Sequence, residues 1–436
     1  MQIADAVGGS VVGPDLTVSG ASIDSRDIGG GELFVPIVAG RDGHDFIAAA
    51  LAAGAAAYLT SRRADDGGTA IVVDDTAAAF TRLGAAARDR LPDRVVGITG
   101  SVGKTSTKDL LASVLSQRWV TGASPQSFNN ELGVPLTLVN APERCEALVV
   151  EMGARGRGHI ASLCEVARPA VGVVTAVAAV HTELFGTIDD VAVAKRELVE
   201  ALPPSGTAVL NALDERVLAM ADHCAGRVLT FGGDRADVRA DGLALDDELR
   251  PSFTLVTPWG STAVDMSIRG AHQVANALAA AAAGLACDVP LDAVALGLAS
   301  AQLSRWRMEL SRTPSGALVL NDAYNANPTS VAAALESLAT LDARRRVAVL
   351  GVMAELGPES DDEHARIGKL AGELGVDVIA VDAPAYGVDK DVADVDAALD
   401  ALAELRLATG DAVLVKGSRV AGLERVAAAL TGIEKP

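Results

Sequence analysis

The sequence predicts an α/β protein of three domains: a small mixed α/β domain over residues 1–93, a central doubly wound domain over 94–312, and a smaller α/β domain over 313–436. Three observations lead to this prediction. The 436 residues suffice for two to four domains of ordinary size. Short, continuously apolar runs alternate with helical patterns through the second and third domains. Turn-forming residues interrupt that rhythm at 91–94 and at 312–316, which sets the two boundaries.

The first domain combines short β-like runs with an Ala-rich segment and many turn residues. The runs at 32–38 and 70–73 predict strands. The apolar stretch 46–59 is predicted to form a buried helix, since it is too short to cross a bilayer.

The central domain shows four continuously apolar runs, each followed by polar residues: 95–98, 147–150, 171–174 and 208–210. Continuous hydrophobicity is what a parallel strand buried on both faces requires. The pattern becomes irregular over 231–265, where we expect an antiparallel edge, and the Ala-rich stretch 277–287 predicts a buried helix.

The last domain repeats the strand–helix rhythm, with apolar runs at 318–320, 347–350, 378–381 and 412–415. Ligands of open α/β sheets bind beyond the carboxyl ends of the strands. The residues that follow each run are therefore the first candidates for a site.

Charge and cysteine content exclude several classes of function. The formal net charge of −20 argues against nucleic acid or an anionic membrane surface as a partner. The four cysteines lie far apart without a CxxC pair, which indicates reduced thiols in a cytoplasmic protein. We expect no secretory signal and no integral membrane segment, because no apolar stretch approaches the ~20 residues that a bilayer needs.

A glycine loop, Gly100–Thr105, follows the first apolar run of the central domain and precedes a helical pattern. Its glycines let backbone amides close around phosphate oxygens, and the helix directs its positive end at the same point. Lys104 can reach the outer phosphates, and the Thr105 hydroxyl can ligate magnesium. The strict motif has glycine where this chain has Ile98, so a chance glycine turn is the alternative. The strand–loop–helix context favours a nucleotide-binding P-loop domain.

Three residues are candidate metal ligands. Glu151 directly follows an apolar run, where P-loop proteins keep an acid for magnesium; otherwise it is a solvated glutamate. His181 follows the next run and is either a ligand or a structural histidine. Lys195 stands in a helical pattern and is either a surface lysine or, once uncharged or modified, a neighbour of the metal.

Three polar clusters remain open on pattern alone: Gly270–Asn276, Arg305–Glu309 and Asn321–Pro328. Helix capping and turn chemistry explain them as well as a binding site does. The chain has no Gly-x-Ser-x-Gly elbow and no zinc-spaced Cys/His set, so we expect no covalent protein nucleophile.

Taken together, these motifs resemble those of the Mur ligase family, the ATP-dependent amide-forming enzymes of peptidoglycan precursor synthesis. The segments that carry the resemblance in the first two domains are Ile23–Arg26, Gly31–Val35, Asp42–Phe46, Thr99–Thr105, Phe128–Thr137 and Glu151–Ala154. Three later segments resemble the branch that adds D-alanyl-D-alanine to UDP-N-acetylmuramoyl-tripeptide: Asn321–Pro328, Val349–Gly357, and Val415–Arg419 with Glu424. The Asp-Asn-Pro-Arg motif of the diaminopimelate-adding branch is absent.

The resemblance implies a UDP-sugar-binding first domain, an ATP-binding central P-loop domain and a Rossmann-like C-terminal ligase domain, in a protein expected to be monomeric. It implies ATP and Mg²⁺, with Thr105 and Glu151 at one magnesium, His181 at another, and Lys195 carbamylated beside them. The residues it implies for catalysis are Lys104, Glu151, His181 and Lys195. Those it implies for ATP binding are Gly100, Ser101, Val102, Gly103, Lys104, Thr105, Ser106, Asn276, Arg307 and Asp322. Those it implies for substrate binding are Ser25, Arg26, Gly43, His44, Asn129, Asn130, Asn325 and Asn327.

The chain departs from the family pattern at four positions. Gln273 stands where Asn is usual, Val352 where Asp is usual, and Ala176 and Ala178 where Asn and Gly are common. The histidine loop and the peptide end of the site are the parts that these departures affect.

The implied chemistry follows from the poor electrophilicity of a carboxylate. ATP would phosphorylate the terminal carboxylate of the tripeptide, the dipeptide amine would attack the acyl phosphate, and phosphate would leave. We expect the C-terminal domain to close over the central one to exclude water. The alternatives are a sister ligase with another substrate, such as another amino acid or a folate, and a non-catalytic nucleotide-binding paralogue. A plain phosphotransferase would not need a third domain.

Overall fold

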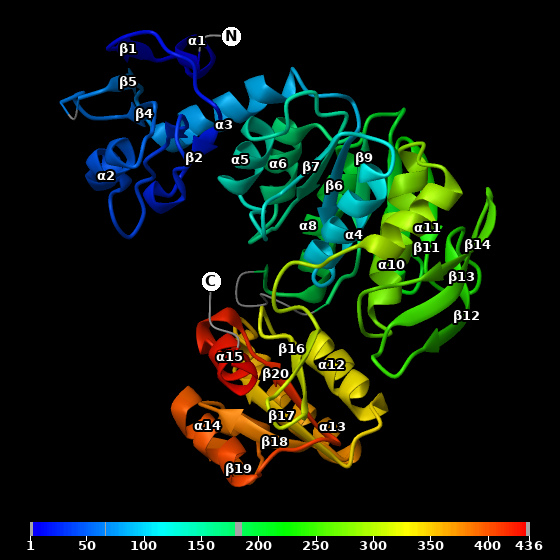
Figure 1. Ribbon diagram of the computed structural model, residues 1–436. Helices are drawn as coiled ribbons and strands as arrows, with labels where there is room; N and C mark the ends of the chain where they lie inside the picture. Colours follow the sequence, from blue (N-terminus) through cyan, green and yellow to red (C-terminus); the bar gives the residue numbers. More distant parts are fainter. Residues whose placement is uncertain (1–2, 66, 179–184, 433–436) are drawn as a thin grey trace.

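The computed structural model describes residues 3–65, 67–178 and 185–432. Within them the chain forms three α/β bodies, each with its own sheet, and a smaller fourth sheet (Figure 1). The first body is the blue part of Figure 1, the central body runs from cyan to green, and the last body runs from yellow to red. The predicted α/β class with three parts is confirmed.

The first body is built on a five-stranded sheet with the order β1-β5-β4-β3-β2, in which β1 is antiparallel to β5 and the other pairs are parallel. Its strands are β1 (Ser10–Val12), β2 (Ala21–Ser22), β3 (Leu33–Phe34), β4 (Ala57–Thr60) and β5 (Thr69–Val72). Its helices are α1 (Ile3–Val7), α2 (Ile47–Ala52), α3 (Thr76–Arg88) and the 3-10 turns η1 (Ser25–Asp27) and η2 (Gly43–Phe46).

The single buried helix predicted over 46–59 is wrong. The helix α2 ends at Ala52, Gly54 turns the chain with a φ of +106°, and the remainder becomes the buried strand β4. An Ala-rich apolar run carries no period that separates a short helix from a buried strand, so the glycine was the informative residue.

The central body holds a six-stranded parallel sheet with the order β11-β10-β9-β6-β8-β7. Its strands are β6 (Val95–Thr99), β7 (Thr121–Ala123), β8 (Ala147–Glu151), β9 (Val171–Val174), β10 (Thr207–Asn211) and β11 (Arg227–Phe231). Its helices are α4 (Lys104–Ser116), α5 (Gly133–Val139), α6 (His159–Ala167), α8 (Ile188–Glu200), α9 (Glu215–Leu218), η3 (Ala219–His223), α10 (Gln273–Ala286) and α11 (Leu291–Ser300). The four predicted strands and the predicted buried helix within 277–287 are confirmed.

Helices cover both faces of this sheet, as the continuous hydrophobicity of its strands requires. One core packs Val96 and Ile98 of β6 against α4, α10 and α11. The opposite core packs Val95 and the inward residues of β8 against α5, α6 and α8. In the strand order β6 lies between β9 and β8, so its end is near the middle of the sheet.

The predicted antiparallel strands of 231–265 are present, but beyond Phe231, which ends the edge strand β11, they do not join the central sheet. They form a separate antiparallel sheet of β12 (Arg239–Leu245), β13 (Pro251–Thr257) and β14 (Gly260–Asp265). Phe253, Leu255 and Val264 pack into the same core as α10 and α11. The alternating burial along β13 reflects a sheet with only one covered face.

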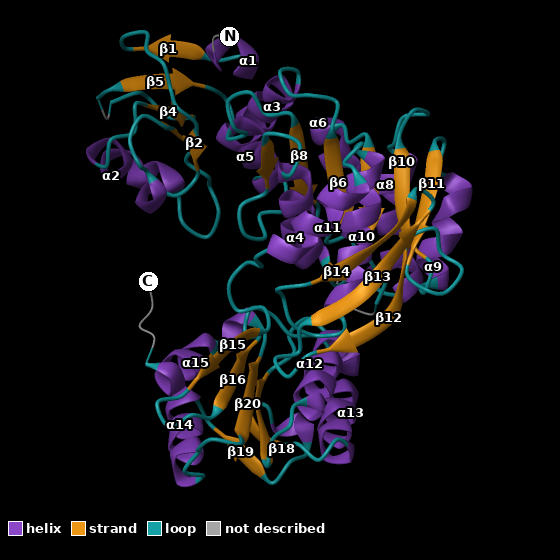
Figure 2. Ribbon diagram, turned by 45° about the vertical axis from the view of Figure 1, so that its right-hand side comes forward, coloured by secondary structure: helices purple, strands orange, loops and turns teal. Residues whose placement is uncertain are grey.

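The last body is a six-stranded sheet with the order β15-β16-β20-β17-β18-β19, and Figure 2 shows helices on both of its faces. Its strands are β15 (Glu309–Arg312), β16 (Leu318–Asn321), β17 (Arg345–Gly351), β18 (Asp377–Val381), β19 (Lys390–Val392) and β20 (Asp411–Lys416). Its helices are α12 (Pro328–Thr340), α13 (Ser360–Glu373), α14 (Val395–Glu404), α15 (Glu424–Thr431) and the turns η4 (Gly357–Glu359), η5 (Pro384–Tyr386) and η6 (Arg419–Ala421). All four predicted strands are present.

The strand β15 pairs antiparallel with β16, so the last sheet begins at Glu309, ahead of the boundary expected after residue 312. The bounds of the three domains stay a prediction.

The first and central bodies are docked by helix packing and by one side chain. Ala87 of α3 lies in a core of the central body, and Leu136 of α5 lies in the core of the first body. Asn140, just after α5, accepts a hydrogen bond from Ala21 N and donates one to Ala21 O, both at 2.8 Å. Its carboxamide therefore extends the edge strand β2 as a peptide group would.

Among the helices of the described residues, none is both long and apolar enough to cross a membrane.

Candidate functional site

The phosphate loop joins the end of β6 to the start of α4. Gly100 and Gly103 have φ values of +146° and +84°, which favour glycine. A Cβ on Gly100 would lie 1.9 Å from Thr175 Oγ1, and one on Gly103 would lie 2.4 Å from Asn276 Oδ1. Both the backbone angles and the crowding therefore require glycine in this loop.

Lys104 begins α4 and folds back over the loop, where its Nζ donates to the carbonyl oxygen of Gly100 at 2.6 Å. Burial lowers the pKa of this lysine, the negative charge of Glu151 opposes that effect, and the positive charge of Arg307 adds to it. Glu151 and Arg307, which are far from Lys104 in sequence, thus face the same ammonium.

Glu151 is the last residue of β8 and is fully buried. Its Oε1 accepts a hydrogen bond from Asn129 Nδ2 at 2.9 Å, whereas its Oε2 has no hydrogen-bond partner within the described part of the chain. A buried carboxylate oxygen without a donor is costly unless a cation completes it. The buried Thr105 lines the same cavity, so the oxygen donors present fit magnesium.

A magnesium ion here would depend on few protein ligands. Among residues 3–65, 67–178 and 185–432, no three His, Cys, Asp or Glu side chains gather to hold a metal. Magnesium commonly takes one or two protein oxygens and completes its shell with substrate phosphates and water. The predicted ligand His181 lies outside the described residues.

Lys195 lies on α8 and is 3% exposed. Burial lowers its pKa to about 7, with help from the positive charge of Lys104 and against the negative charge of Glu197. Its Nζ lies 5.9 Å from the centroid of the Phe185 ring. The surface-lysine interpretation is therefore wrong: Lys195 is a buried amine that faces the same cavity as Lys104.

The last body contributes the opposite wall of the cavity. Lys416, at the end of β20, donates from Nζ to Asp322 Oδ2 at 2.5 Å and to the carbonyl oxygen of Asn325 at 3.0 Å. Asp322 Oδ1 also accepts from Met308 N at 3.2 Å. Asn327 caps α12, since its Oδ1 accepts from Ser330 N. These contacts fix the loop after β16 within the last body.

The two walls enclose a cavity of about 620 Å³. Most of the predicted site residues line it: Gly100, Ser101, Val102, Gly103, Lys104, Thr105, Ser106, Asn129, Asn130, Glu151, Lys195, Asn276, Arg307, Asp322, Asn325 and Asn327. The larger opening of about 930 Å³ near Arg88 and Cys164 holds none of them. The smaller cavity is the candidate active site.

The side chains of two cavity residues, Asn129 and Asn130, already form hydrogen bonds within the protein. Asn130 Oδ1 accepts from the backbone N–H groups of Leu132 and Gly133, at 3.2 and 2.9 Å, which starts α5. Asn129 holds Glu151, as described. Their amide groups therefore organise the site whether or not they also touch a substrate.

The predicted substrate residues of the first body lie apart from this cavity. Ser25 and Arg26 belong to η1, where Asp24 caps the turn and pairs with the exposed Arg26. The hydrogen bond from Arg26 lowers the pKa of Asp24 to about 2, although partial burial opposes the shift. Gly43 has no room for a Cβ, which would lie 2.5 Å from Ile37 N.

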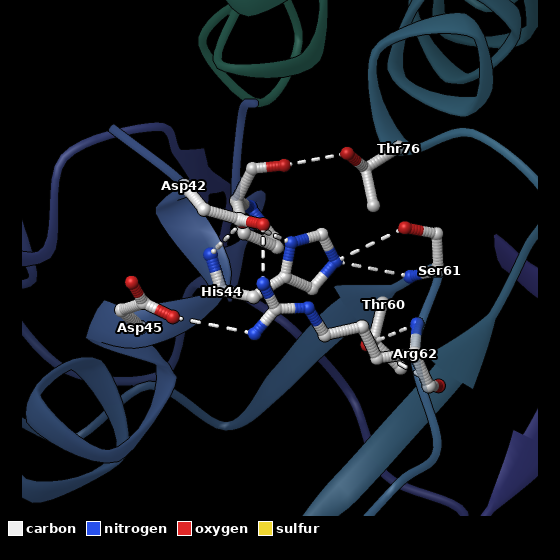
Figure 3. Close-up of polar contacts among 8 residues, drawn as sticks. Asp42, His44, Asp45, Thr60, Ser61, Arg62 and Thr76 are labelled. Atoms are coloured by element: carbon white, nitrogen blue, oxygen red, sulfur yellow. Dashed lines mark hydrogen bonds and ion pairs between the residues drawn. The ribbon is translucent and has the colours of Figure 1, made fainter. Parts of the chain in front are cut away.

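His44 is buried, and both of its ring nitrogens are engaged (Figure 3). Nδ1 lies 2.6 Å from Asp42 Oδ1, and Nε2 accepts from Ser61 N at 3.1 Å. Arg62 pairs with Asp42 and with Asp45 across the same cluster. His44 thus joins the loop after β3 to the end of β4.

Sequence reasoning gave no role to several cavity residues, among them Ser127, His272, Tyr324 and Lys416. Lys416 directly follows an apolar run, so the rule for strand ends could have found it. Ser127 stands in no motif, and no local signal marks it.

Comparisons with known proteins agree with this geometry. A model of the Mur ligase middle domain matches residues 98–284, and a model of the Mur ligase glutamate ligase domain matches residues 306–419. The UDP-N-acetylmuramoyl-tripeptide--D-alanyl-D-alanine ligase of Mycobacterium tuberculosis (strain ATCC 25618 / H37Rv) is 41% identical, over 98% of this chain and 96% of that protein. The chain belongs to the Mur ligase family.

Other Mur ligases are similar over the same extent. The ligase of that name from Escherichia coli K12 is 38% identical over 98% of this chain and 97% of its own. Among solved structures, MurF from Acinetobacter baumannii superposes with a TM-score of 0.89 at 31% identity, covering 98% of this chain and 97% of that one. MurF from Thermotoga maritima, solved in complex with ADP, gives a TM-score of 0.79 at 26% identity, with 94% and 96% coverage. Similarity of this Mur ligase to its relatives thus extends through all three bodies.

Proposed function

We propose that this protein joins D-alanyl-D-alanine to UDP-N-acetylmuramoyl-tripeptide and converts ATP to ADP and phosphate. The observation that carries the proposal is the cavity itself. A glycine loop with Lys104 faces Glu151, whose buried oxygen lacks a partner, and a separate body closes the opposite side. The names of the relatives and the ADP bound to one of them support both the reaction and the use of ATP.

The backbone amides of the phosphate loop and Lys104 have a defined task in this reaction. The loop amides and Lys104 hold the triphosphate and neutralise charge as the terminal phosphoryl group moves to the tripeptide carboxylate. The dipeptide amine then forms the new C–N bond, the C–O bond to phosphate breaks, and the amine loses a proton. Arg307 and Asp322 are proposed to hold the nucleotide from the side of the last body.

Thr105 and Glu151 are the proposed magnesium ligands of the triphosphate, and magnesium would supply charge neutralisation and phosphate orientation there. We assign His181 and a carbamylated Lys195 to a second ion. A lysine whose pKa is lowered to about 7 is available as the neutral amine that carbon dioxide needs for carbamate formation. The carbamate would also replace a buried cation by an anion that can approach magnesium.

The first body is proposed to bind the UDP-sugar through Ser25, Arg26 and Gly43. Because His44 is buried with both nitrogens engaged, we assign it to holding that surface in shape. Asn325 and Asn327 are proposed to meet the peptide end of the substrates. The protein is proposed to act as a monomer in the cytoplasm.

Two alternatives make different predictions. A sister ligase would accept a single amino acid in place of D-alanyl-D-alanine. A non-catalytic nucleotide-binding paralogue would release no phosphate with any pair of substrates, although Lys104, Thr105, Glu151 and Lys195 all remain in the cavity.

The deciding experiment measures phosphate release by the purified protein with ATP, Mg²⁺ and UDP-N-acetylmuramoyl-tripeptide, with and without D-alanyl-D-alanine. We expect release that depends on both acceptor and dipeptide. Release with a single amino acid but not with the dipeptide would establish the sister ligase. Nucleotide binding without any phosphate release would contradict the enzyme assignment.

A further inference from the structure

Tyr324 and Ser127 connect the two walls of the cavity. Tyr324 lies in the loop after β16 of the last body, and Ser127 lies in the loop after β7 of the central body. The hydroxyl groups of the two residues form a hydrogen bond. This bond can exist only while the two bodies are close together.

The loop that carries Ser127 is held by hydrogen bonds from the buried Lys108. Lys108 is 2% exposed, and its Nζ donates to the carbonyl oxygens of Ser124 and Gln126, at 2.9 and 2.6 Å. Gln126 adopts a φ of +48°, which is uncommon for a residue other than glycine. The buried ammonium thus holds the backbone just before Ser127 in a conformation that it would otherwise avoid.

On the other side, the ring of Tyr324 supports Arg307. The guanidinium carbon of Arg307 lies 4.3 Å from the ring centroid, a cation–π distance. Arg307 Nε is buried and has no hydrogen-bond partner within the described residues. Since Arg307 also lines the cavity beside Lys104, its guanidinium is placed to receive an anion there.

The backbone around Arg307 is strained and depends on the last body. Trp306 and Met308 have φ values of +60° and +52°, in the left-handed region. Such strain persists where neighbouring contacts hold it. Those contacts are Tyr324 N to the carbonyl oxygen of Trp306, at 3.3 Å, and Met308 N to Asp322 Oδ1, at 3.2 Å.

We propose that Tyr324 is a positioning residue that makes the placement of Arg307 depend on the contact between the central and last bodies. Its ring and backbone hold Arg307, and its hydroxyl bonds to the central body through Ser127. When the bodies separate, the Ser127 bond breaks and Arg307 moves away with the last body, so the phosphate site is complete only in the closed molecule. The inference rests on the proposed function, in which Arg307 holds the nucleotide.

The test is a double-mutant cycle on the full chain with Tyr324→Phe, Ser127→Ala and the double variant. Two quantities are measured: the dissociation constant of a non-hydrolysable ATP analogue with Mg²⁺, and kcat/KM for ATP in the ligation assay. Each single variant should lose about fivefold in both, the effect of one hydrogen bond. The double variant should be no weaker than the single ones, because both remove the same bond. Tyr324→Leu, which also removes the ring, should lose more than Tyr324→Phe.

Tyr386→Phe is the matched control. It removes a hydrogen bond from a tyrosine hydroxyl to the carbonyl oxygen of Gly351, at 3.0 Å, inside the last body. In the dissociation constant and in kcat/KM, any effect of Tyr386→Phe should add to that of Ser127→Ala. Tyr386→Phe should also lower the melting temperature, whereas Tyr324→Phe should leave it unchanged.

Additive effects of Tyr324→Phe and Ser127→Ala in both measurements would overturn the inference. The analogue binds without any ligation step, so the two proposals can fail separately. If the two substitutions are coupled in analogue binding but the protein releases no phosphate, the proposed function is wrong and the inference stands. If the protein ligates fully but the effects of the two substitutions are additive, the inference is wrong and the proposed function stands.

Discussion

Glu151 illustrates how a side chain acquires its role from its surroundings. Its place after an apolar run could be predicted from sequence, because strand ends meet at one edge of a parallel sheet. That Asn129 holds one of its oxygens, while the other has no donor in the described chain, could not be predicted. The contact joins segments whose relative position depends on tertiary packing and leaves no local pattern.

The departures from the family pattern in the loop after β9 fall at residues whose contacts with the phosphate loop use backbone groups. Ser101 N donates to the carbonyl oxygen of Ala176, and Ser101 Oγ exchanges hydrogen bonds with the backbone of Ala178. Both alanines thus support the phosphate loop through backbone groups, which any residue supplies. Gln273 instead acts through its side chain, since its Oε1 accepts from Asn276 Nδ2 at 2.8 Å.

Lys104→Ala should slow ligation severely while the fold is kept. We expect a loss on the order of 10²–10³ in kcat, the size found when one preorganised donor to a developing charge is removed. Lys104 is only half-buried and bonds mainly to its own loop, so the free energy of unfolding should change little. Phosphate release and urea unfolding measure the two effects. Lys369→Ala, at an exposed lysine of α13, is the control, and turnover of Lys104→Ala equal to that control would refute the role.

Lys195→Ala should also be slow, for a different reason. If a carbamate on Lys195 is the active form, a small carboxylic acid can occupy the space left by the side chain and restore part of the rate. The measurement is phosphate release against acid concentration. Lys104→Ala should show no such rescue under the same conditions, and a flat response of Lys195→Ala would leave it as a buried structural lysine.

At the scale of elements, the strand runs of the parallel sheets were predictable because their burial on both faces produces unbroken hydrophobicity. The two errors share a dependence on distant residues. Over 46–59 a short helix, a turn and a strand follow one another within a few residues, so no period has room to develop. Over 231–265 three antiparallel strands form, and the local pattern does not say which sheet they join. Pairing partners, which are distant in sequence, decide the outcome there.

The strand β20 depends on a buried acid at its first residue, Asp411. Burial alone would raise the pKa of Asp411, but hydrogen bonds from Ala408 N and Arg344 outweigh it and hold the pKa below the ordinary 3.8. A depressed pKa contributes stability that is present above pH 3.8 and is lost as the pH falls through the folded-state value.

Asp411→Asn should therefore lower the free energy of unfolding at pH 7 by about 1.5–3 kcal/mol, the range for hydrogen bonds to a charged group. The deficit should shrink as the pH falls below 4, because the wild-type carboxylate then protonates. Urea unfolding between pH 3 and 7 measures both values. Asp377→Asn, at an exposed position of β18, should show neither effect, and a deficit of Asp411→Asn that is independent of pH would contradict the argument.

The arrangement of the whole molecule was the least accessible to sequence reasoning. Three parts could be counted from the restarts of the strand–helix rhythm. The contacts between them, such as Asn140 with Ala21 and Ser127 with Tyr324, could not be predicted, although Tyr324 stands in the segment Asn321–Pro328 that the sequence marks. The cavity is likewise a property of two bodies and of neither sequence segment alone.

Closure of the last body over the central one should be visible by small-angle X-ray scattering. Addition of an ATP analogue together with UDP-N-acetylmuramoyl-tripeptide should reduce the radius of gyration, because cavity groups such as Lys104, Glu151 and Arg307 gain a shared ligand. The profile with both ligands should match the one calculated from this structure. Identical profiles with and without ligands would count against closure.

The docking of the first body by Asn140, α3 and α5 has a consequence for substrate length. Since that junction is packed and hydrogen-bonded, we expect the span from the surface around His44 to the phosphate loop to stay constant if the last body moves. If the first body binds the UDP-sugar as proposed, the stem peptide must reach across that span, at about 3.3–3.6 Å for each extended residue. We therefore expect selection for stem length, because the carboxylate of a stem one residue too short would not reach the phosphate and a stem one residue too long would have to bend to fit.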